Sequence, residues 1–157
     1  MTAPSKPASR TSPERKQKKR TGGTPVRVLA RQAIDALLDK KGRDVVVMDM
    51  RKVSGVADYF VLCTGDSDLQ IKALTDAVEE RLRERCQERP WHREGYEHRQ
   101  WVLIDYVDLV VHIFTEEKRA FYDLERLWGD APSEQVPEDG SGDTVQLLRD
   151  ADERPQP

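Results

Sequence analysis

The run of five apolar residues from Tyr59 to Cys63 constrains the fold of this chain more than any other feature. Successive side chains of a strand point to opposite faces of its sheet, so a strand that is apolar throughout is covered on both faces. Such strands lie in the centre of a sheet. The run therefore favours an α/β protein, in which helices pack on the sheet.

The remaining apolar pattern indicates helices and further strands. From Val26 to Leu38 apolar residues recur at the i, i+3, i+4, i+7 spacing of one helix face. The other expected elements are a strand at 44–50, a helix from about 71 to 85, an edge strand near Trp91, a hairpin of strands 100–106 and 108–114, and a helix at 116–128. We predict a single domain with a mixed β-sheet and packed helices, including a right-handed crossover after the strand at 59–64.

The charges are concentrated at the two ends of the chain. Residues 1–25 hold seven Lys and Arg against one Glu, and residues 129–157 hold eight Asp and Glu against two Arg. Segments with so few apolar residues cannot offset their conformational entropy by burial. We therefore expect a disordered basic tail at 1–25, a folded domain at 26–131 and a disordered acidic tail at 132–157. The basic tail is either a solubilising segment or a weak contact for RNA.

The sequence gives no indication of a membrane protein. No apolar run approaches the roughly 18 residues that span a bilayer, and no apolar segment follows the N-terminal charges as in a signal peptide. We expect a cytoplasmic protein.

The turn after the central strand, at Gly65, has two interpretations. Ser67 and Gln70 have the spacing of a capping box, in which the serine side chain accepts from the amide three residues later. The alternative is a nucleotidyltransferase-like site with Asp66 and Asp68 as metal ligands. That chemistry also needs paired carboxylates on a later strand, and the sequence offers no such pair. The pattern favours a cap.

The histidines do not indicate a catalytic or metal site. His112 lies in an apolar strand, which is typical of a core histidine hydrogen-bonded to backbone. His92 and His98 lie in a polar stretch, and no spacing of His, Cys and Asp forms a familiar metal-ligand set. We expect no enzyme activity, no metal and no cofactor.

The strand at 100–106 points toward a macromolecular partner. Trp101, Leu103 and Asp105 alternate with Val102 and Ile104, so the two sets lie on opposite faces. Either the first set is exposed, with Trp101 available to a partner, or the sheet is covered on both faces and Trp101 and Leu103 are core residues.

The last predicted helix carries a second candidate surface. Its buried stripe is expected to contain Phe121, Leu124 and Trp128, with Tyr122 turned about 100° away from it, near Arg119. Exposed aromatic and arginine side chains are typical of interface hot spots.

Three segments of the chain resemble one known family. ADYFVLCTGDSDLQIKAL, EGYEHRQWVLIDYVDLVVHIF and EEKRAFYDLERLWGDAP are similar to the Iojap-like ribosomal silencing factors, over roughly residues 26–131. The resemblance implies a domain similar to the nucleotidyltransferase fold without its chemistry. The two charged tails are departures from the family.

The resemblance also implies a function. Members bind the large ribosomal subunit through a ribosomal protein at the inter-subunit face, block joining of the small subunit and repress translation when nutrients are limiting. By this resemblance the partner-binding residues are Trp101, Leu103, Asp105, Arg119 and Tyr122. A homodimer is left open for the free protein. The alternatives are a divergent nucleotidyltransferase using Asp66 and Asp68, and a general RNA-binding protein using the basic tail.

Overall fold

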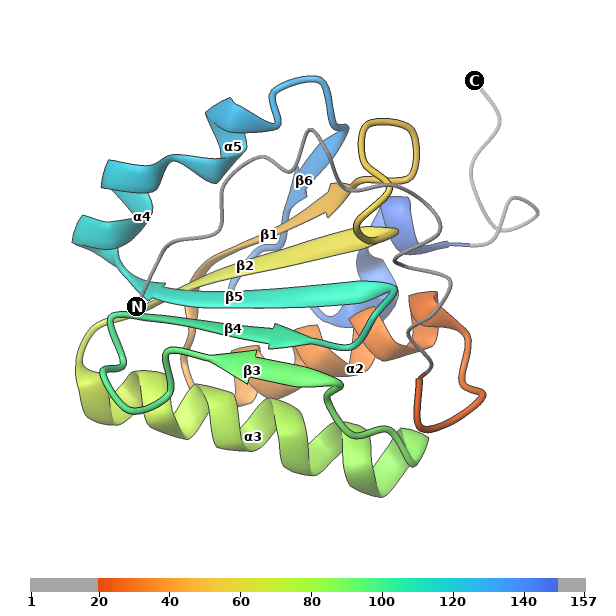
Figure 1. Ribbon diagram of the computed structural model, residues 1–157, viewed down its shortest axis with the longest axis horizontal. Helices are drawn as coiled ribbons and strands as arrows, with labels where there is room; N and C mark the ends of the chain where they lie inside the picture. The colour runs from red at the N-terminus through yellow and green to blue at the C-terminus, as the bar shows by residue number, and fades with distance from the viewer. Residues whose placement is uncertain (1–19, 150–157) are drawn as a thin grey trace.

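The computed structural model describes residues 20–149, and its centre is a six-stranded sheet in the order β3-β4-β5-β2-β1-β6 (Figure 1). The strands are β1 (Arg43–Asp49), β2 (Tyr59–Gly65), β3 (His92–Glu94), β4 (Trp101–Asp105), β5 (Leu109–Thr115) and β6 (Ser133–Gln135). β2 and β5 pair in parallel, whereas the other neighbours are antiparallel. The predicted α/β class with a mixed sheet is confirmed, and β4 and β5 form the predicted hairpin.

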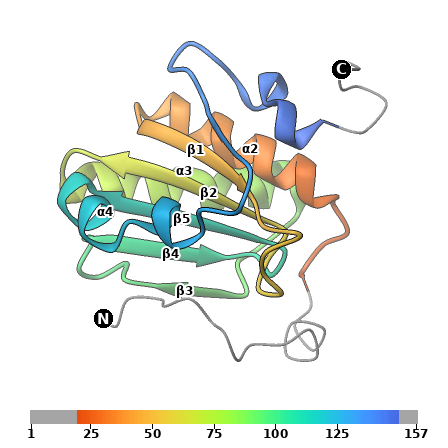
Figure 2. The same ribbon diagram turned by 90° about the horizontal axis from the view of Figure 1, so that it is seen from above.

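Helices lie on both faces of this sheet, as Figures 1 and 2 show. The helices are α2 (Val26–Asp39), α3 (Asp68–Cys86), α4 (Glu116–Tyr122) and α5 (Leu124–Leu127), followed by the 3-10 turns η1 (Gly142–Thr144) and η2 (Gln146–Leu148). α2 and α3 lie on one face, and α4 and α5 on the other. The chain leaves β2 through α3 and returns in β3, which is parallel to β2 but separated from it by β5 and β4.

β2 is buried along its whole length, which confirms the prediction of a central strand. Its side chains alternate between two cores. Tyr59, Val61 and Cys63 face the core formed with α2 and α3. Phe60 and Leu62 face the core that also contains residues of α5. The apolar run therefore needs two layers of cover, and the chain provides both.

The prediction of one continuous helix at 116–128 is wrong. α4 ends after Tyr122, where Asp123 adopts the left-handed conformation with φ of 46°. Aspartate tolerates this conformation better than most residues because its short polar side chain can bond locally. The break changes the direction of the chain, and with it the set of side chains that faces the sheet.

The expectation of a disordered tail from residue 132 onward is also wrong for the part of that segment that the structure describes. β6 extends the sheet beside β1. Val136, Val145 and Leu148 are buried in the core formed by α2 and α3. Figure 2 shows this C-terminal segment beside α2. A few well-placed apolar side chains thus order a segment that is acidic overall.

Polar contacts fix the same segment to the domain. The carboxylate of Glu134 accepts from the backbone N–H groups of Gln146 and Leu147, each at 3.0 Å. The N–H of Gly142 donates to the Asp35 carboxylate on α2 at 2.7 Å. These bonds satisfy backbone donors that no helix or strand pairs, which is the usual requirement for burying a loop.

The chain before α2 is anchored as well. The Thr24 hydroxyl donates to the carbonyl of Cys86 at 2.9 Å, and Arg20 pairs with Asp108 at 3.0 Å. The expectation of disorder is therefore wrong for residues 20–25, while the rest of the predicted basic tail lies outside the described residues.

Among the helices that the structure describes, none is long and apolar enough to cross a membrane.

We expect Gly142→Ala to destabilise the protein, because a Cβ there would lie 2.3 Å from the carbonyl oxygen of Arg31 in α2. Forcing an atom into such a contact costs about 1–3 kcal/mol. Gly23→Ala is the matched control, since its Cβ would meet nothing within 4 Å. Chemical denaturation of both variants measures the effect, and equal stabilities would show that the C-terminal segment does not pack on α2.

A candidate partner-binding face

Trp101 lies inside the protein. Its exposed fraction is 1%, and its ring lies against those of Phe114 and Tyr122, with centroids 5.5 and 4.8 Å away. Its indole N–H donates to Nδ1 of His112 at 3.1 Å. We call these four residues the aromatic cluster. The expectation that the Trp101 ring is available to a partner is therefore wrong, because side chains cover both faces of the sheet at this end of β4.

His112 holds the cluster together as a neutral acceptor. It is buried, and Phe60 meets its ring edge-on at a centroid distance of 4.8 Å. Burial lowers the pKa of His112 to about 3, because the charged imidazolium would lose its hydration. Because Nδ1 accepts from the Trp101 indole, the neutral ring carries its single proton on Nε2. The prediction of a core histidine is confirmed, although its partner is this indole instead of a backbone group.

The break at Asp123 exchanges the expected positions of two neighbouring aromatic residues. Tyr122, predicted to point away from the core, packs on Trp101 and is half-buried. Phe121, predicted to be buried, is 76% exposed. Leu124 and Trp128, on the far side of the break, are buried as predicted.

Arg119 fastens α4 to the sheet. Its guanidinium donates to the carbonyl of Asp44 at 2.6 Å and to the hydroxyl of Thr64 at 2.9 Å, and it pairs with Glu125 at 3.1 Å. Only 12% of its side chain is exposed. The expectation of an exposed Arg119 is wrong, since these bonds to β1, β2 and α5 hold the guanidinium against the protein.

Asp105 organises the turn between β4 and β5. Its carboxylate accepts from the N–H of Val107 at 2.7 Å, and Val107 has φ of 72°. A β-branched residue rarely adopts this conformation, so the turn depends on bonds that compensate for the strain. Asp105 thus has a structural contact of its own, beside the partner-binding role implied by the resemblance.

An apolar surface remains beside the aromatic cluster. Leu103 on β4 and Tyr122 on α4 are half-buried, and Phe121 lies 4.9 Å from Tyr122, measured between ring centroids. We call Leu103, Phe121 and Tyr122 the docking face. In Figure 1, α4 and α5 lie over the β5, β2 and β1 side of the sheet. Sequence reasoning selected Leu103 and Tyr122 but missed Phe121, because the helix break at Asp123 gives only a weak signal.

The turn at Gly65 is a helix cap. The hydroxyl of Ser67 accepts from the N–H of Gln70 at 3.1 Å, as predicted. The Gln70 side chain accepts from the N–H of Asp66 at 2.6 Å, instead of from that of Ser67. Gly65 is required by a close approach, since a Cβ there would lie 2.6 Å from Ile71.

The two aspartates of this turn do not form a metal site with other residues. Asp66 pairs with Arg43 at 2.6 Å, and the described residues contain no group of three or more His, Cys, Asp and Glu that could hold a metal ion. The Arg43 guanidinium already pairs with one of the two candidate ligands. The nucleotidyltransferase-like interpretation therefore gains no support from this geometry.

Comparisons with known proteins agree with the resemblance noted in the sequence. The model of the family described as "Ribosomal silencing factor during starvation" (RsfS) matches residues 24–156. A ribosomal silencing factor from Halalkalibacterium halodurans is 42% identical over 108 residues, which are 69% of this chain and 92% of that protein. A crystal structure from Chromobacterium violaceum superposes with a TM-score of 0.65 at 37% identity, covering 68% of this chain and 88% of that one.

A more distant relative is named for the large subunit. The mouse protein "Mitochondrial assembly of ribosomal large subunit protein 1" is 27% identical over 97 residues, which are 60% of this chain and 42% of that protein.

This chain thus belongs to a class of ribosome-associated regulatory factors and not of enzymes. It is a member of the RsfS family of ribosomal silencing factors. The matched region extends beyond the boundary that we expected at residue 131 and includes the C-terminal segment that packs on α2.

We expect Trp101→Ala to destabilise the domain by about 3–5 kcal/mol, as for other truncations of large buried aromatic residues. Removing the indole leaves a cavity in the core. It also leaves Nδ1 of His112 buried without its hydrogen-bond donor. Thermal and urea unfolding measure the change. A variant that melts within a degree or two of the wild type would contradict the burial described above.

We also expect acid to weaken the fold through His112. Its pKa is about 3 in the folded chain against an ordinary 6.5, so between these values the unfolded chain binds more protons. The stability of the fold is therefore not reduced by His112 above pH 6.5. As the pH falls below that value, the free energy of unfolding decreases by up to about 1.4 kcal/mol per pH unit for this one proton. The free energy of unfolding, measured from pH 7 to 5, should fall less steeply in His112→Gln. Identical slopes would mean that folding does not lower the pKa of His112.

Proposed function

We propose that this protein binds the large ribosomal subunit through a ribosomal protein at the inter-subunit face, blocks joining of the small subunit and represses translation when nutrients are limiting. Support comes from the family description, which names ribosomal silencing during starvation, and from the mouse relative named for the large subunit. Steric exclusion of this kind needs affinity and bulk but no catalytic turnover. A domain with a partner surface and a capped turn at Gly65 fits that requirement.

The observation that carries the proposal is an exposed apolar docking face on a rigid base. Phe121 is 76% exposed, so its large apolar side chain contributes little to the core. Burial of this side chain against a partner would be favourable, because it removes apolar surface from water. Next to it, the Tyr122 ring packs at a tilt against Trp101, whose indole donates to His112. Side chains that are held in place before binding lose little conformational entropy when a partner arrives.

Polar residues border this surface. Glu94 on β3 pairs across the strands with Leu103 and thus shares its side of the sheet. His92 lies 3.0 Å from the Glu94 carboxylate on the same edge. An apolar centre with a polar rim is the usual anatomy of a protein–protein interface.

The five residues implied by the resemblance therefore take different roles within this proposal. Leu103 and Tyr122 touch the partner, together with Phe121. Trp101 and Arg119 do not touch the partner. Trp101 supports the side chains of the docking face from the core, and Arg119 fixes α4, which carries Phe121 and Tyr122, to the sheet. Asp105 sets the turn at the end of β4.

Three finer expectations belong to the same proposal. The protein works in the cytoplasm with the ribosomes, and the basic segment at the N-terminus, most of which lies outside the described residues, adds a weak contact to ribosomal RNA. A homodimer of the free protein would cover the docking face until a ribosome is bound.

The test replaces one exposed apolar side chain with a charge. We expect Phe121→Glu to fold normally and to weaken binding to purified large subunits by about 30-fold or more, the effect of losing an interface hot spot. Leu69→Glu is the matched control, because Leu69 is 72% exposed at the start of α3, a helix on the other face of the sheet. Cosedimentation and a subunit-joining assay give the readouts.

Two outcomes would contradict the proposed face. If Phe121→Glu binds as the wild type does, the partner contacts another surface. If Leu69→Glu loses binding to the same degree, the effect of charge is not specific to the docking face. Leu103→Thr, which keeps a strand-forming residue at a half-buried position, provides a second variant for the same assays.

A further inference from the structure

The two sides of the sheet are protected from further strand pairing in different ways. β3 forms one edge, and its three residues are all polar or charged: His92, Arg93 and Glu94. On the other side, β1 contains four successive apolar residues at 45–48, and only the short β6 lies outside it. Short charged edges resist pairing with another chain, whereas longer apolar edges favour it. The protection of β1 therefore depends on the segment that contains β6.

The C-terminal segment, residues 133–148, covers the outer edge of β1. At one end, the N–H of Val136 donates to the carbonyl of Val45 at 2.8 Å. At the other end, the N–H of Asp49 donates to the carbonyl of Pro132, also at 2.8 Å. β6 pairs in antiparallel fashion with the β1 residues between these two bonds. The apolar part of the edge is thus closed along its whole length.

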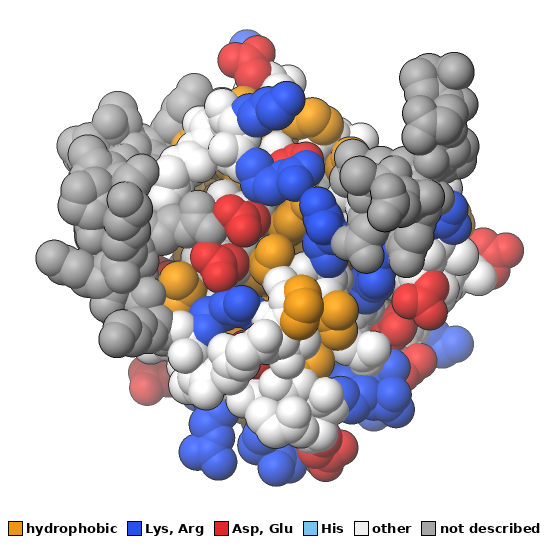
Figure 3. All heavy atoms as spheres, turned by 90° about the vertical axis from the view of Figure 1, so that its right-hand side faces the viewer, with side chains coloured by type: hydrophobic (Ala, Val, Ile, Leu, Met, Phe, Trp, Pro, Cys, Tyr) orange, Lys and Arg blue, Asp and Glu red, His pale blue; other side chains and the backbone are white. Residues whose placement is uncertain are grey.

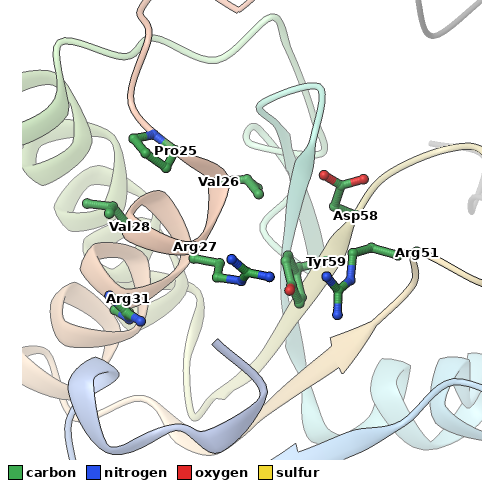
Figure 4. A pocket seen from close by; sticks show the side chains of 8 residues that line it. All are labelled: Pro25, Val26, Arg27, Val28, Arg31, Arg51, Asp58 and Tyr59. Carbon is green, nitrogen blue, oxygen red and sulfur yellow. The ribbon is translucent and has the colours of Figure 1, made fainter. Parts of the chain in front are cut away.

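Few side chains hold this cover in place. Its buried apolar residues are Val136, Val145 and Leu148. Figure 4 shows Arg31 on α2, whose guanidinium donates to the carbonyl of Leu148. On its inner side β1 pairs with β2, and α2 shares a core with α3, so neither element depends on the segment alone. A terminal segment attached in this way can open locally while the rest of the domain stays folded.

Opening of the segment would uncover an edge that is complementary to itself. The backbone groups of Val45, Val47 and Asp49 face outward, because these groups alternate between the two sides of a strand. A two-fold axis at Val46 places Val45 of one copy opposite Val47 of the other, so that outward-facing groups meet. The register shift in β1 between Arg43 and Val46 ends the usable edge. Pairing of identical surfaces about such an axis closes at two copies.

We propose that the outer edge of β1 is a latent interaction surface for a second copy of this chain, and that the C-terminal segment keeps it closed. Figure 3 views the end of the domain at which β1 ends and β2 begins, where hydrophobic side chains appear in small groups among charged ones. Release of the segment joins the sheets of two copies through β1. The association state of the protein then depends on its own residues 133–148.

This surface is distinct from the docking face. Phe121 and Tyr122 belong to α4 and Leu103 to β4, and β5 and β2 separate β4 from β1 in the sheet. A homodimer formed through the docking face leaves the edge of β1 closed. The proposal therefore stands or fails independently of ribosome binding.

The experiment detects pairing of two β1 strands by a disulfide. At the two-fold axis, the Cα atoms of opposite residues in a pair without hydrogen bonds are about 4.5 Å apart, which a disulfide can bridge. Val46→Cys is introduced into the full chain with and without Val136→Asp, which places a charge at a buried anchor of the segment. All chains carry Phe121→Glu, so that association through the docking face does not contribute. Electrophoresis without reductant, after mild oxidation, gives the rate of dimer formation.

Two controls separate this pairing from other causes of cross-linking. Leu69→Cys, in place of Val46→Cys, puts the thiol at a position that is 72% exposed on α3 and measures random collisions. Leu124→Ala, in place of Val136→Asp, weakens the core on the other face and measures the effect of a general loss of stability. The native cysteines are both buried.

Two further measurements keep the result interpretable. Hydrogen exchange of the Val47 amide verifies that the segment has opened, and Val145→Asp replaces Val136→Asp if the latter does not fold. A synthetic peptide of residues 131–148, added in excess, competes with the second copy for the open edge.

We expect Val136→Asp to raise the rate of cross-linking through Val46→Cys by at least about 10-fold, because a charge at a buried anchor shifts the segment toward its open state. The peptide should reverse this increase. The proposal is overturned by equal rates with and without Val136→Asp, or by absence of the disulfide although the Val47 amide exchanges. Equal cross-linking with Leu69→Cys or with Leu124→Ala overturns it as well.

Discussion

The parallel pairing of β2 with β5 is the constraint on which the other elements depend. The two strands are in register from Tyr59 and Leu109 to Gly65 and Thr115, and both are buried almost throughout. Parallel strands cannot be joined by a tight turn, so α3, β3 and β4 have to lie between them in the chain. Because the pair is apolar on both faces, helices are needed on each side. The order and layers of the domain follow from these two requirements.

The two faces are covered to different degrees, and this difference produces the docking face. α2 and α3 are long and form one continuous core with the sheet. On the other face, α4 and α5 have seven and four residues and are separated by Asp123. Aromatic rings fill the space that a longer helix would occupy, with Trp101 bonded to His112 and covered by Tyr122. The apolar surface of Leu103 and Phe121 is what remains at the edge of this cover.

Much of the fold follows from periodicity, while the site depends on contacts that periodicity does not encode. The strand from Tyr59, the cap at Ser67 and the hairpin were predicted because each has a local pattern. The alternation along β4 correctly placed Trp101 and Leu103 on one face of the sheet and Val102 and Ile104 on the other. It could not show that helices cover both of these faces.

The missed features share a physical cause. The left-handed Asp123 turns one helix into two, and a single aspartate gives little warning of it. The C-terminal segment is ordered by a few side chains such as Val145 and Leu148, scattered among acidic residues, Pro and Gly. Arg119 was assigned to a partner through the resemblance, and no local pattern indicated its acceptors, the Asp44 carbonyl and the Thr64 hydroxyl, which are distant in sequence. Tertiary packing decided each of these positions.

The packing of the C-terminal segment on α2 has a consequence for the order of folding. The bond from Gly142 to Asp35 joins residues that are 107 positions apart, and β6 pairs with β1 across 85 to 89 positions. Contacts between distant residues close large loops and slow folding. During synthesis, α2 and β1 leave the ribosome long before the residues that cover them. The domain therefore completes this core only after residues 133–148 have emerged, and until then the part of α2 that they cover stays exposed.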